Sequence, residues 1–232
     1  MTVHDTVRAL RPLAGDLGAR SGAETAYGYE LPEAHRELLR ELNGFTAYHG
    51  AFRLFGTGRP AHLDLAAWNA PQTWRFAWDE RAEPFVFFGE TAWGDQYAYR
   101  REPGGRLAPE VHFLEGNFLR SEVIAGSFEE FLADELLRNA KEPYDELTVE
   151  AVERYGPIAA DQHWAFVPSL AMDGTEDIGQ VMQLPAVTAM VYAGDIATAV
   201  GAAAPDDLLT GVAPWTDDQG RARLRVLSVG LS

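Results

Sequence analysis

The sequence predicts an α+β fold, in which a mainly antiparallel sheet is flanked by helices. Strand-forming and turn-forming residues alternate between residues 85 and 115, which is typical of an antiparallel meander. Helical patterns lie on either side of this region, at residues 31–44 and 127–140. A second run of helix and strand patterns follows, so we also expect a smaller α/β C-terminal part packed on the sheet.

The first predicted elements precede the meander. Residues 31–44, LPEAHRELLRELNG, predict a half-buried helix, because the leucines form a stripe and Pro32 suits the first turn. Gly44 supplies a left-handed stop. Residues 45–56, FTAYHGAFRLFG, predict a strand or hairpin, and residues 62–69 predict a short helical turn.

The stretch FFGETAWGDQYAYR, residues 87–100, carries five aromatic residues and two carboxylates, so it is the segment most suggestive of chemistry. The apolar run at residues 85–88 is too short for a stable helix and predicts a strand buried on both faces. Gly94 predicts a turn. The alternation of Tyr97 and Tyr99 with their neighbours then predicts a strand half exposed to water. We therefore interpret the stretch as part of a sheet.

A third strand is predicted at residues 107–115, LAPEVHFLE, and a capped helix closes this half of the chain. Ser127 followed by Glu130 has the spacing of a capping box, ahead of a series of apolar positions. The composition then becomes polar. We place a domain boundary there, between residues 1–140 and 141–232.

The second domain is predicted to contain two helices, a strand and a hairpin. A helix is expected from about residue 145 to residue 155, and a strand in HWAFVPSL is cut short by Pro168. An apolar helix is predicted to begin at Pro185, and a hairpin is predicted around residues 218–220.

The charge distribution restricts the classes of partner. The formal net charge is −16, and residues 142–218 contain 14 acids against a single base, Arg154. Direct binding to nucleic acid is unfavourable for such a protein, because affinity for phosphates depends on Lys and Arg. The acidic second half predicts either ordinary solubility or a negative face for a basic protein partner.

Other absences in the sequence exclude further classes. There are no cysteines, which excludes disulfides, thiolate metal sites and cysteine nucleophiles. No run of about 18 apolar residues could cross a bilayer, and the first 20 residues have no apolar core of the signal-peptide type. We expect a cytoplasmic protein that does not contact membranes.

No catalytic motif is recognisable in the sequence. The patterns HExxH, GxGxxG and GxSxG and the P-loop do not occur. A carboxylate-dependent hydrolase that uses Glu90, Asp95 and His112 is an alternative interpretation. However, an aspartate beside a glycine at a turn usually bonds nearby backbone amides, so we predict no catalytic residues.

Two further clusters have open interpretations. Residues 173–177, DGTED, gather oxygen ligands in a loop but lack the order of an EF-hand, so we predict no metal or cofactor and leave ion binding at this loop open. Four tryptophans, at positions 68, 74, 78 and 93, fall within 26 residues. They indicate either core packing or an aromatic patch that faces a partner.

Several segments together resemble known families. LPEAHRELLRELNGF, FRLFG, DLAAWN, PFVFFGETAWGDQYAY and SFEEFL, in this order, resemble the SUKH superfamily and its relative the GAD-like domain. In these families an N-terminal helix leads into a strongly curved sheet. YGPIAADQHWAFVPSLAMDGTEDIGQV is similar to the C-terminal domain of type VI secretion immunity proteins. The two resemblances cover roughly residues 28–200.

The resemblance implies a non-catalytic protein that binds and neutralises a bacterial toxin, often a nuclease. An acidic surface suits this role, because it can occupy the region of a basic nuclease that binds phosphates. A hydrolase and a regulatory scaffold that binds a cytoplasmic protein or a small ligand are the alternatives. The toxin's identity and the oligomeric state do not follow from the sequence. We predict that the partner contacts are Trp93, Asp95, Tyr97, Asp173, Glu176 and Asp177.

Overall fold

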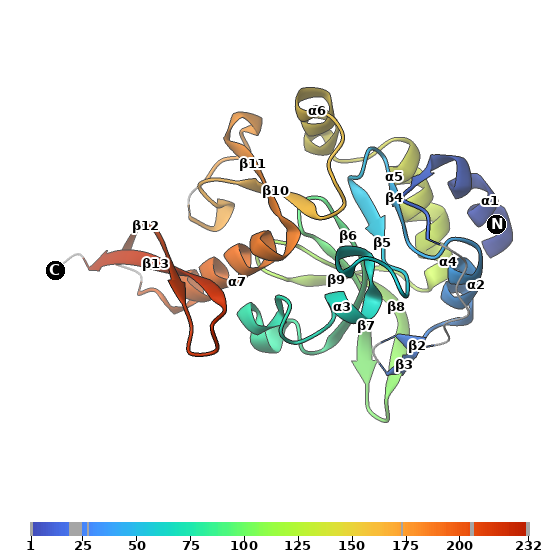
Figure 1. The fold of residues 1–232 in the computed structure, drawn as a ribbon, viewed down its shortest axis with the longest axis horizontal. Helices are drawn as coiled ribbons and strands as arrows, with labels where there is room; N and C mark the ends of the chain where they lie inside the picture. Colours follow the sequence, from blue (N-terminus) through green and yellow to red (C-terminus); the bar gives the residue numbers. More distant parts are fainter. Residues whose placement is uncertain (1, 19–24, 27, 173, 205–206, 231–232) are drawn as a thin grey trace.

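The structure is a computed structural model that describes residues 2–18, 25–26, 28–172, 174–204 and 207–230. The α+β class is confirmed (Figure 1). Seven strands form one sheet in the order β1-β4-β5-β6-β7-β8-β9, and every neighbouring pair in it is antiparallel.

The first part of the chain contains this sheet and the helices around it. The strands of the sheet are β1 Ala14–Gly15, β4 Phe45–Ala47, β5 Phe52–Leu54, β6 Phe85–Thr91, β7 Gln96–Glu102, β8 Arg106–Leu114 and β9 Ser121–Ala125. A separate short pair is β2 Thr25–Ala26 and β3 Tyr29–Glu30. The helices are α1 Val3–Leu10, α2 Glu33–Glu41, α3 Leu65–Trp68, α4 Phe128–Glu130 and α5 Leu137–Lys141, with a π-helical segment Phe131–Leu136 between the last two.

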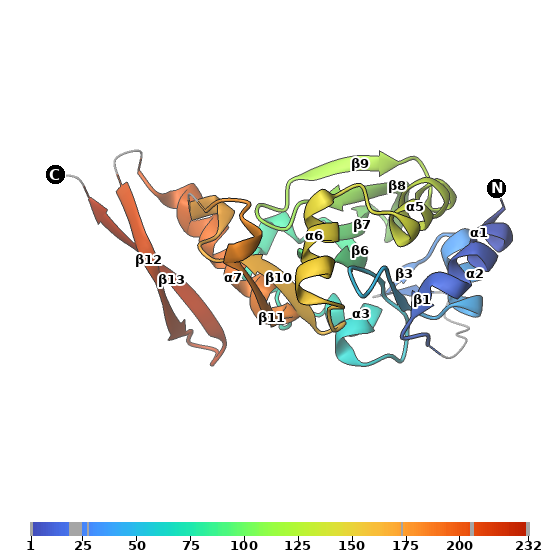
Figure 2. The ribbon, with the colours of Figure 1, turned by 90° about the horizontal axis from the view of Figure 1, so that it is seen from above.

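The remaining elements follow residue 141. They are α6 Glu146–Tyr155, β10 Gln162–Phe166, β11 Val181–Pro185, α7 Ala186–Ala202, β12 Asp207–Thr216 and β13 Ala222–Gly230. Short 3₁₀ turns occur at Arg11–Leu13, Ala61–Leu63, Arg75–Ala77, Asp79–Arg81, Leu170–Met172 and Ile178–Gln180. The β12–β13 hairpin lies at the opposite end of the molecule from α1 (Figures 1 and 2). In the described parts of the chain, no helix has both the length and the apolar character required to cross a membrane.

Local sequence signals explain most of these elements. The Ser127 side chain accepts from the backbone N–H of Glu130 (3.2 Å), as a capping residue should, and the helix begins at the next residue. The Glu130 carboxylate accepts from Gly126 N–H (2.7 Å), one residue earlier than a standard capping box predicts. The predicted β10, α6, α7 and C-terminal hairpin are all present, whereas α1, β9 and β11 were not predicted.

The central strands are covered on both faces, which corrects one prediction. Residues 96–99 of β7 are all buried, although the sequence predicts a half-exposed strand. Tyr97 and Tyr99 face the helices, where the ring of Tyr97 lies 4.9 Å from that of Phe131. The opposite face is covered by the segment after α3, because Trp74 packs on Phe87 (5.1 Å between centroids). The prediction was wrong because the segment after α3 covers the second face of the sheet. Its apolar residues do not repeat with the period of a helix or a strand, so the sequence does not mark this segment as a layer.

The C-terminal part packs directly on the edge of this assembly. Trp164 N–H of β10 donates to the carbonyl of Ala92 (2.7 Å), and Trp78 Nε1–H donates to the carbonyl of Met190 in α7 (2.8 Å). At Gly194 a Cβ atom would lie 2.7 Å from the carbonyl oxygen of Ala77, so only glycine permits this approach of α7. The domain boundary at residues 140/141 stays a prediction.

Candidate functional site

A pocket of about 240 Å³ lies between the two parts of the chain. On one side it is lined by the β6–β7 turn and the β8–β9 turn. On the other side it is lined by the start of α6, by β10 and by α7. The pocket is therefore assembled from segments that are far apart in the sequence.

Four carboxylates line the pocket: those of Asp95, Glu115, Asp145 and Glu176. None of the described residues around it is Lys or Arg. Asp145 caps α6, since its side chain accepts from Leu147 N–H (3.0 Å) and from the Thr148 hydroxyl (2.8 Å). The pocket consequently has a negative potential that no cationic side chain in its lining offsets.

Aromatic rings form another part of the wall. Trp93 is half-buried and stacks on Phe166 with a 7° interplanar angle and 5.2 Å between centroids. Its ring also lies 5.2 Å from that of Trp164. Its Nε1–H donates to the Thr148 hydroxyl (2.8 Å), which fixes the indole at the junction of the two parts. Trp93 is thus the one member of the predicted tryptophan cluster that lines the pocket, while the other three lie in the core.

Asp95 holds two turns together. One carboxylate oxygen accepts from Gly116 N–H (2.8 Å) and the other accepts from the Thr91 hydroxyl (2.7 Å). Burial raises the pKa of Asp95, and the negative charges of Glu115 and Asp145 act in the same direction. The intervening Gly94 has φ +88°, a conformation that favours glycine.

We expect Asp95→Ala to lower the free energy of unfolding by about 1–3 kcal/mol, because it leaves a buried backbone N–H without its acceptor. Urea denaturation would measure this loss. Asp95→Asn is the matched control, because its amide can accept from Gly116 N–H and donate to the Thr91 hydroxyl. Equal stability of Asp95→Ala and the wild type would contradict the assigned turn role.

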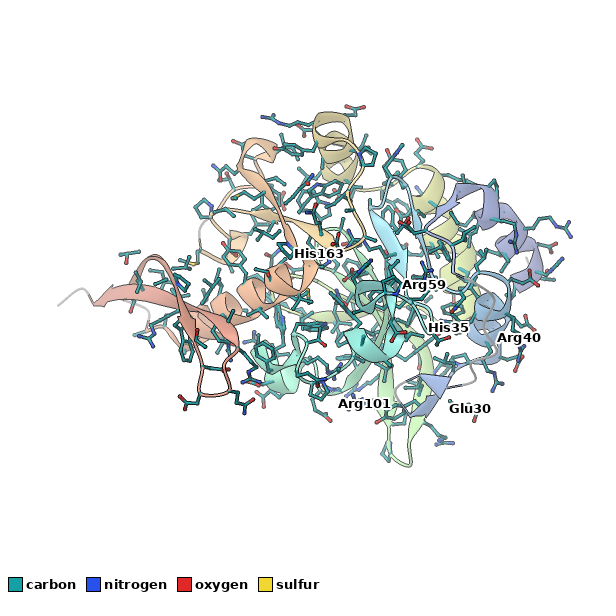
Figure 3. All side chains as sticks on the ribbon, viewed as in Figure 1. Glu30, His35, Arg40, Arg59, Arg101 and His163 are labelled. Atoms are coloured by element: carbon teal, nitrogen blue, oxygen red, sulfur yellow. The ribbon has the colours of Figure 1, made fainter. Side chains whose placement is uncertain are left out.

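A buried charge network lies next to the pocket. Arg53 and Glu90 lie directly opposite each other on the neighbouring strands β5 and β6, and their Nη1 and Oε1 atoms are 3.0 Å apart. Both side chains are 0% exposed. His163 Nε2 of β10 lies 3.1 Å from the second Glu90 oxygen, which also accepts from Gln96 Nε2 (3.1 Å). Figure 3 shows His163 where β10 meets the sheet.

This network connects the two parts of the chain. Arg53 also donates to the carbonyl of Ala159 (3.2 Å), just before β10, and to that of Gln162, the first residue of β10. Burial alone would raise the pKa of Glu90, but the facing His163 and Arg53 lower it below its ordinary value. Both oxygens of Glu90 are occupied by these neighbours, which gives this carboxylate a structural role.

His112, the remaining residue of the hydrolase alternative, also packs among structural residues. His112 of β8 is 8% exposed, and its ring lies 5.3 Å from that of Phe85. Burial lowers the pKa of His112, and the charge of Arg100 adds to this effect. In the described parts of the chain, no group of three His, Asp or Glu side chains could hold a metal ion.

The predicted contact residues lie in different environments. Trp93, Asp95 and Glu176 come together at the pocket. Tyr97 is 1% exposed and packs in the core, and its role as a partner contact stays a prediction. Asp177 is exposed and caps the Ile178–Gln180 turn by accepting from the Gly179 N–H. The predicted Asp173 lies outside the described residues.

The predicted site residues do not include Glu115, Asp145 and Trp164, which also line the pocket. Asp145 was visible only as the start of a helix, and Trp164 only as part of a strand. Glu115 ends the predicted third strand and has no local signal of a site. Their common position depends on the packing of α6 and β10 against the β6–β7 and β8–β9 turns.

Residues 21–134 match the SMI1 / KNR4 family (SUKH-1). This segment is a SUKH domain. It includes β4 to β9 of the central sheet, α2 and both turns that line the pocket from one side. The pocket therefore lies at the border between the SUKH domain and the C-terminal part.

The whole chain also resembles a solved structure, the crystal structure of Atu4351 from Agrobacterium tumefaciens. The TM-score is 0.52 at 12% sequence identity, and the match covers 94% of this chain and 96% of that chain. At this identity the likeness shows the fold alone, and it includes the region after the SUKH domain. No curated protein matches the sequence. SUKH domains are protein-binding modules of the immunity type and are generally non-catalytic.

Proposed function

We propose that this chain is a cytoplasmic, non-catalytic immunity protein that binds and neutralises a basic protein toxin. The SUKH domain supports the class of protein-binding module. The acidic surface beside the pocket is the observation that supports a basic partner. The resemblance of the second half to type VI secretion immunity proteins supports a secreted effector as the toxin, and the charge favours a nuclease.

The acidic surface consists of exposed side chains after residue 141. Every described acid between residues 142 and 177 is exposed: Glu142, Asp145, Glu146, Glu150, Glu153, Asp161, Glu176 and Asp177. Arg154 is the one base in this range. A surface of this charge attracts a basic partner over several ångströms and orients it before contact.

Two of the acids nearer to the C-terminus, Asp195 and Asp217, have a different role. Asp195 is 5% exposed and pairs with Arg223 of the β12–β13 hairpin, and its Oδ2 accepts from Leu224 N–H (2.6 Å). Asp217 pairs with Arg221 (2.6 Å). These pairs hold the hairpin to α7 and close its turn, so the two carboxylates are engaged within the chain, and most of the exposed acids after residue 141 lie in residues 142–177.

The proposal predicts tight, salt-dependent binding to the toxic product of the adjacent reading frame. We expect the purified chain to inhibit that product, and the association rate to fall as ionic strength rises through about 0.1 M, where the screening length is about 10 Å. Surface plasmon resonance at several salt concentrations would measure the rate. Absence of binding and inhibition at low salt would overturn the proposed function.

A further inference from the structure

The pocket combines features that together specify a kind of ligand. Glu115 and Glu176 line it, and within the described part of the chain neither carboxylate makes an ion pair or a side-chain hydrogen bond. Asp95 and Asp145 add negative charge, although their oxygens are already used by backbone and hydroxyl donors. Two free carboxylates without a cationic neighbour favour a positively charged ligand.

Buried polar atoms at the pocket provide a second, independent observation. His163 and Trp164 both line the pocket and are each 1% exposed. His163 Nδ1 and Trp164 Nε1 have no hydrogen-bond partner among the described residues. A Cβ atom built on Gly94, which also lines the pocket, would lie 3.4 Å from His163 Nδ1, so this nitrogen lies beside a residue of the pocket wall. Buried polar atoms without partners are uncommon in native proteins, and these two lie where a ligand in the pocket can supply the partner.

The aromatic wall restricts the shape of the ligand. Trp93, Trp164 and Phe166 all line the pocket, and the negative quadrupoles of aromatic rings attract cations within about 6 Å of the ring. A hard metal ion instead requires several free oxygen ligands, and the described residues contain no group of three that could supply them. The combination of flat rings and carboxylates matches a planar organic cation, which stacks and forms bidentate hydrogen bonds.

We propose that this pocket binds the guanidinium group of an arginine side chain that the basic protein partner inserts between Trp93 and the carboxylates of Glu115 and Glu176. This proposal rests on the proposed function and names the chemical group of the toxin that the pocket recognises. A guanidinium group contains no hydrogen-bond acceptor, so it cannot satisfy the Trp164 indole N–H. In the proposed complex this N–H donates instead to a backbone carbonyl of the partner, next to the inserted arginine. Arginine is preferred to lysine because only its planar group can stack and pair at the same time.

A short peptide tests the pocket without the natural partner. The probe is acetyl-Gly-Arg-Gly-amide, and the matched probe carries citrulline, a neutral isostere, in place of arginine. Titration is followed by the indole N–H signals of Trp93 and Trp164 in ¹H–¹⁵N spectra. We expect the arginine peptide to shift both signals in a saturable way and the citrulline peptide to bind at least about tenfold more weakly.

Charge-matched variants separate the pocket from the general acidic surface. Glu115→Gln combined with Glu176→Gln removes the two free pocket carboxylates, and we expect affinity for the arginine peptide to fall about tenfold or more. Glu150→Gln combined with Glu153→Gln removes the same charge from the exposed face of α6, outside the pocket, and we expect less than about a threefold change. Equal loss in the two double variants, equal binding of the citrulline peptide, or no binding of the arginine peptide would each overturn the proposal.

The same variants distinguish failure of this inference from failure of the proposed function. If the partner protein binds the Glu115→Gln, Glu176→Gln variant as tightly as the wild type, the arginine pocket is refuted while the toxin-binding function stands. If the wild type binds the arginine peptide specifically but never binds or inhibits the adjacent toxic product, the proposed function is refuted and the pocket chemistry stands.

Discussion

Glu90→Ala is expected to lower the free energy of unfolding by about 3–5 kcal/mol, because it leaves a fully buried arginine without its counter-charge. Arg53 cannot reach water when its partner is removed, since its side chain is 0% exposed. Its remaining acceptors are the backbone carbonyls of Gly50, Ala159 and Gln162, which carry no net charge. Urea denaturation of the variant and the wild type at neutral pH would measure the loss.

A double-mutant cycle isolates the interaction energy between Arg53 and Glu90. Arg53→Met alone and Glu90→Ala alone each leave a buried charge, whereas the double variant leaves neither member of the pair. We expect the double variant to lose less stability than the sum of the two single variants, by about 0.5–3 kcal/mol. Strict additivity, or a Glu90→Ala variant as stable as the wild type, would show that this pair does not support the junction between the SUKH domain and the C-terminal part.

The regular elements could be predicted because their residues repeat with the period of a helix or a strand. The apolar run of β6 and the leucine stripe of α2 both identified their elements correctly. The exposure of β7 could not be predicted, because it depends on residues 70–82, which cover the sheet with turns and 3₁₀ segments. Trp74 and Trp78 in that segment are core residues, and no periodicity marks them as such.

The candidate site depends on register and packing, which a single sequence does not contain. Arg53 and Glu90 are paired only because β5 and β6 adopt the register that places them opposite each other. Trp93 and Asp95 were identified because they occur in an unusual local composition. Glu115 and Trp164 join them only through the packing of distant turns and β10, so no local pattern could identify them.

The second large effect is a loss of stability in acid that originates at His35. This side chain of α2 is 0% exposed, stacks on Phe128 (4.3 Å between centroids, 11°) and has its Nδ1 atom 3.0 Å from the hydroxyl oxygen of Tyr99. Burial lowers the pKa of His35 to about 3. Figure 3 shows its position at α2, away from His163, which lines the pocket.

The direction of the pH dependence follows from proton binding. In the unfolded chain His35 titrates near pH 6.5, so between about pH 6.5 and pH 3 the unfolded state binds a proton that the folded state does not. The part of the unfolding free energy that depends on neutral His35 is therefore fully present above about pH 6.5 and decreases as the pH is lowered. We expect this part to decrease by about 2 kcal/mol between pH 6.5 and pH 5.

Comparison with His35→Asn isolates this contribution from those of other titratable groups, including Glu135, whose pKa is raised by burial. Asparagine does not titrate, and its amide can approach the position of Nδ1 beside the Tyr99 hydroxyl. The variant is expected to be less stable at pH 7, because the ring no longer packs on Phe128. Its unfolding free energy should nevertheless fall less steeply with acid, so the difference between the two proteins narrows by about 2 kcal/mol from pH 6.5 to pH 5. Parallel profiles over this range would mean that His35 takes up a proton in the folded protein, and that the aromatic layer under α2 opens to water.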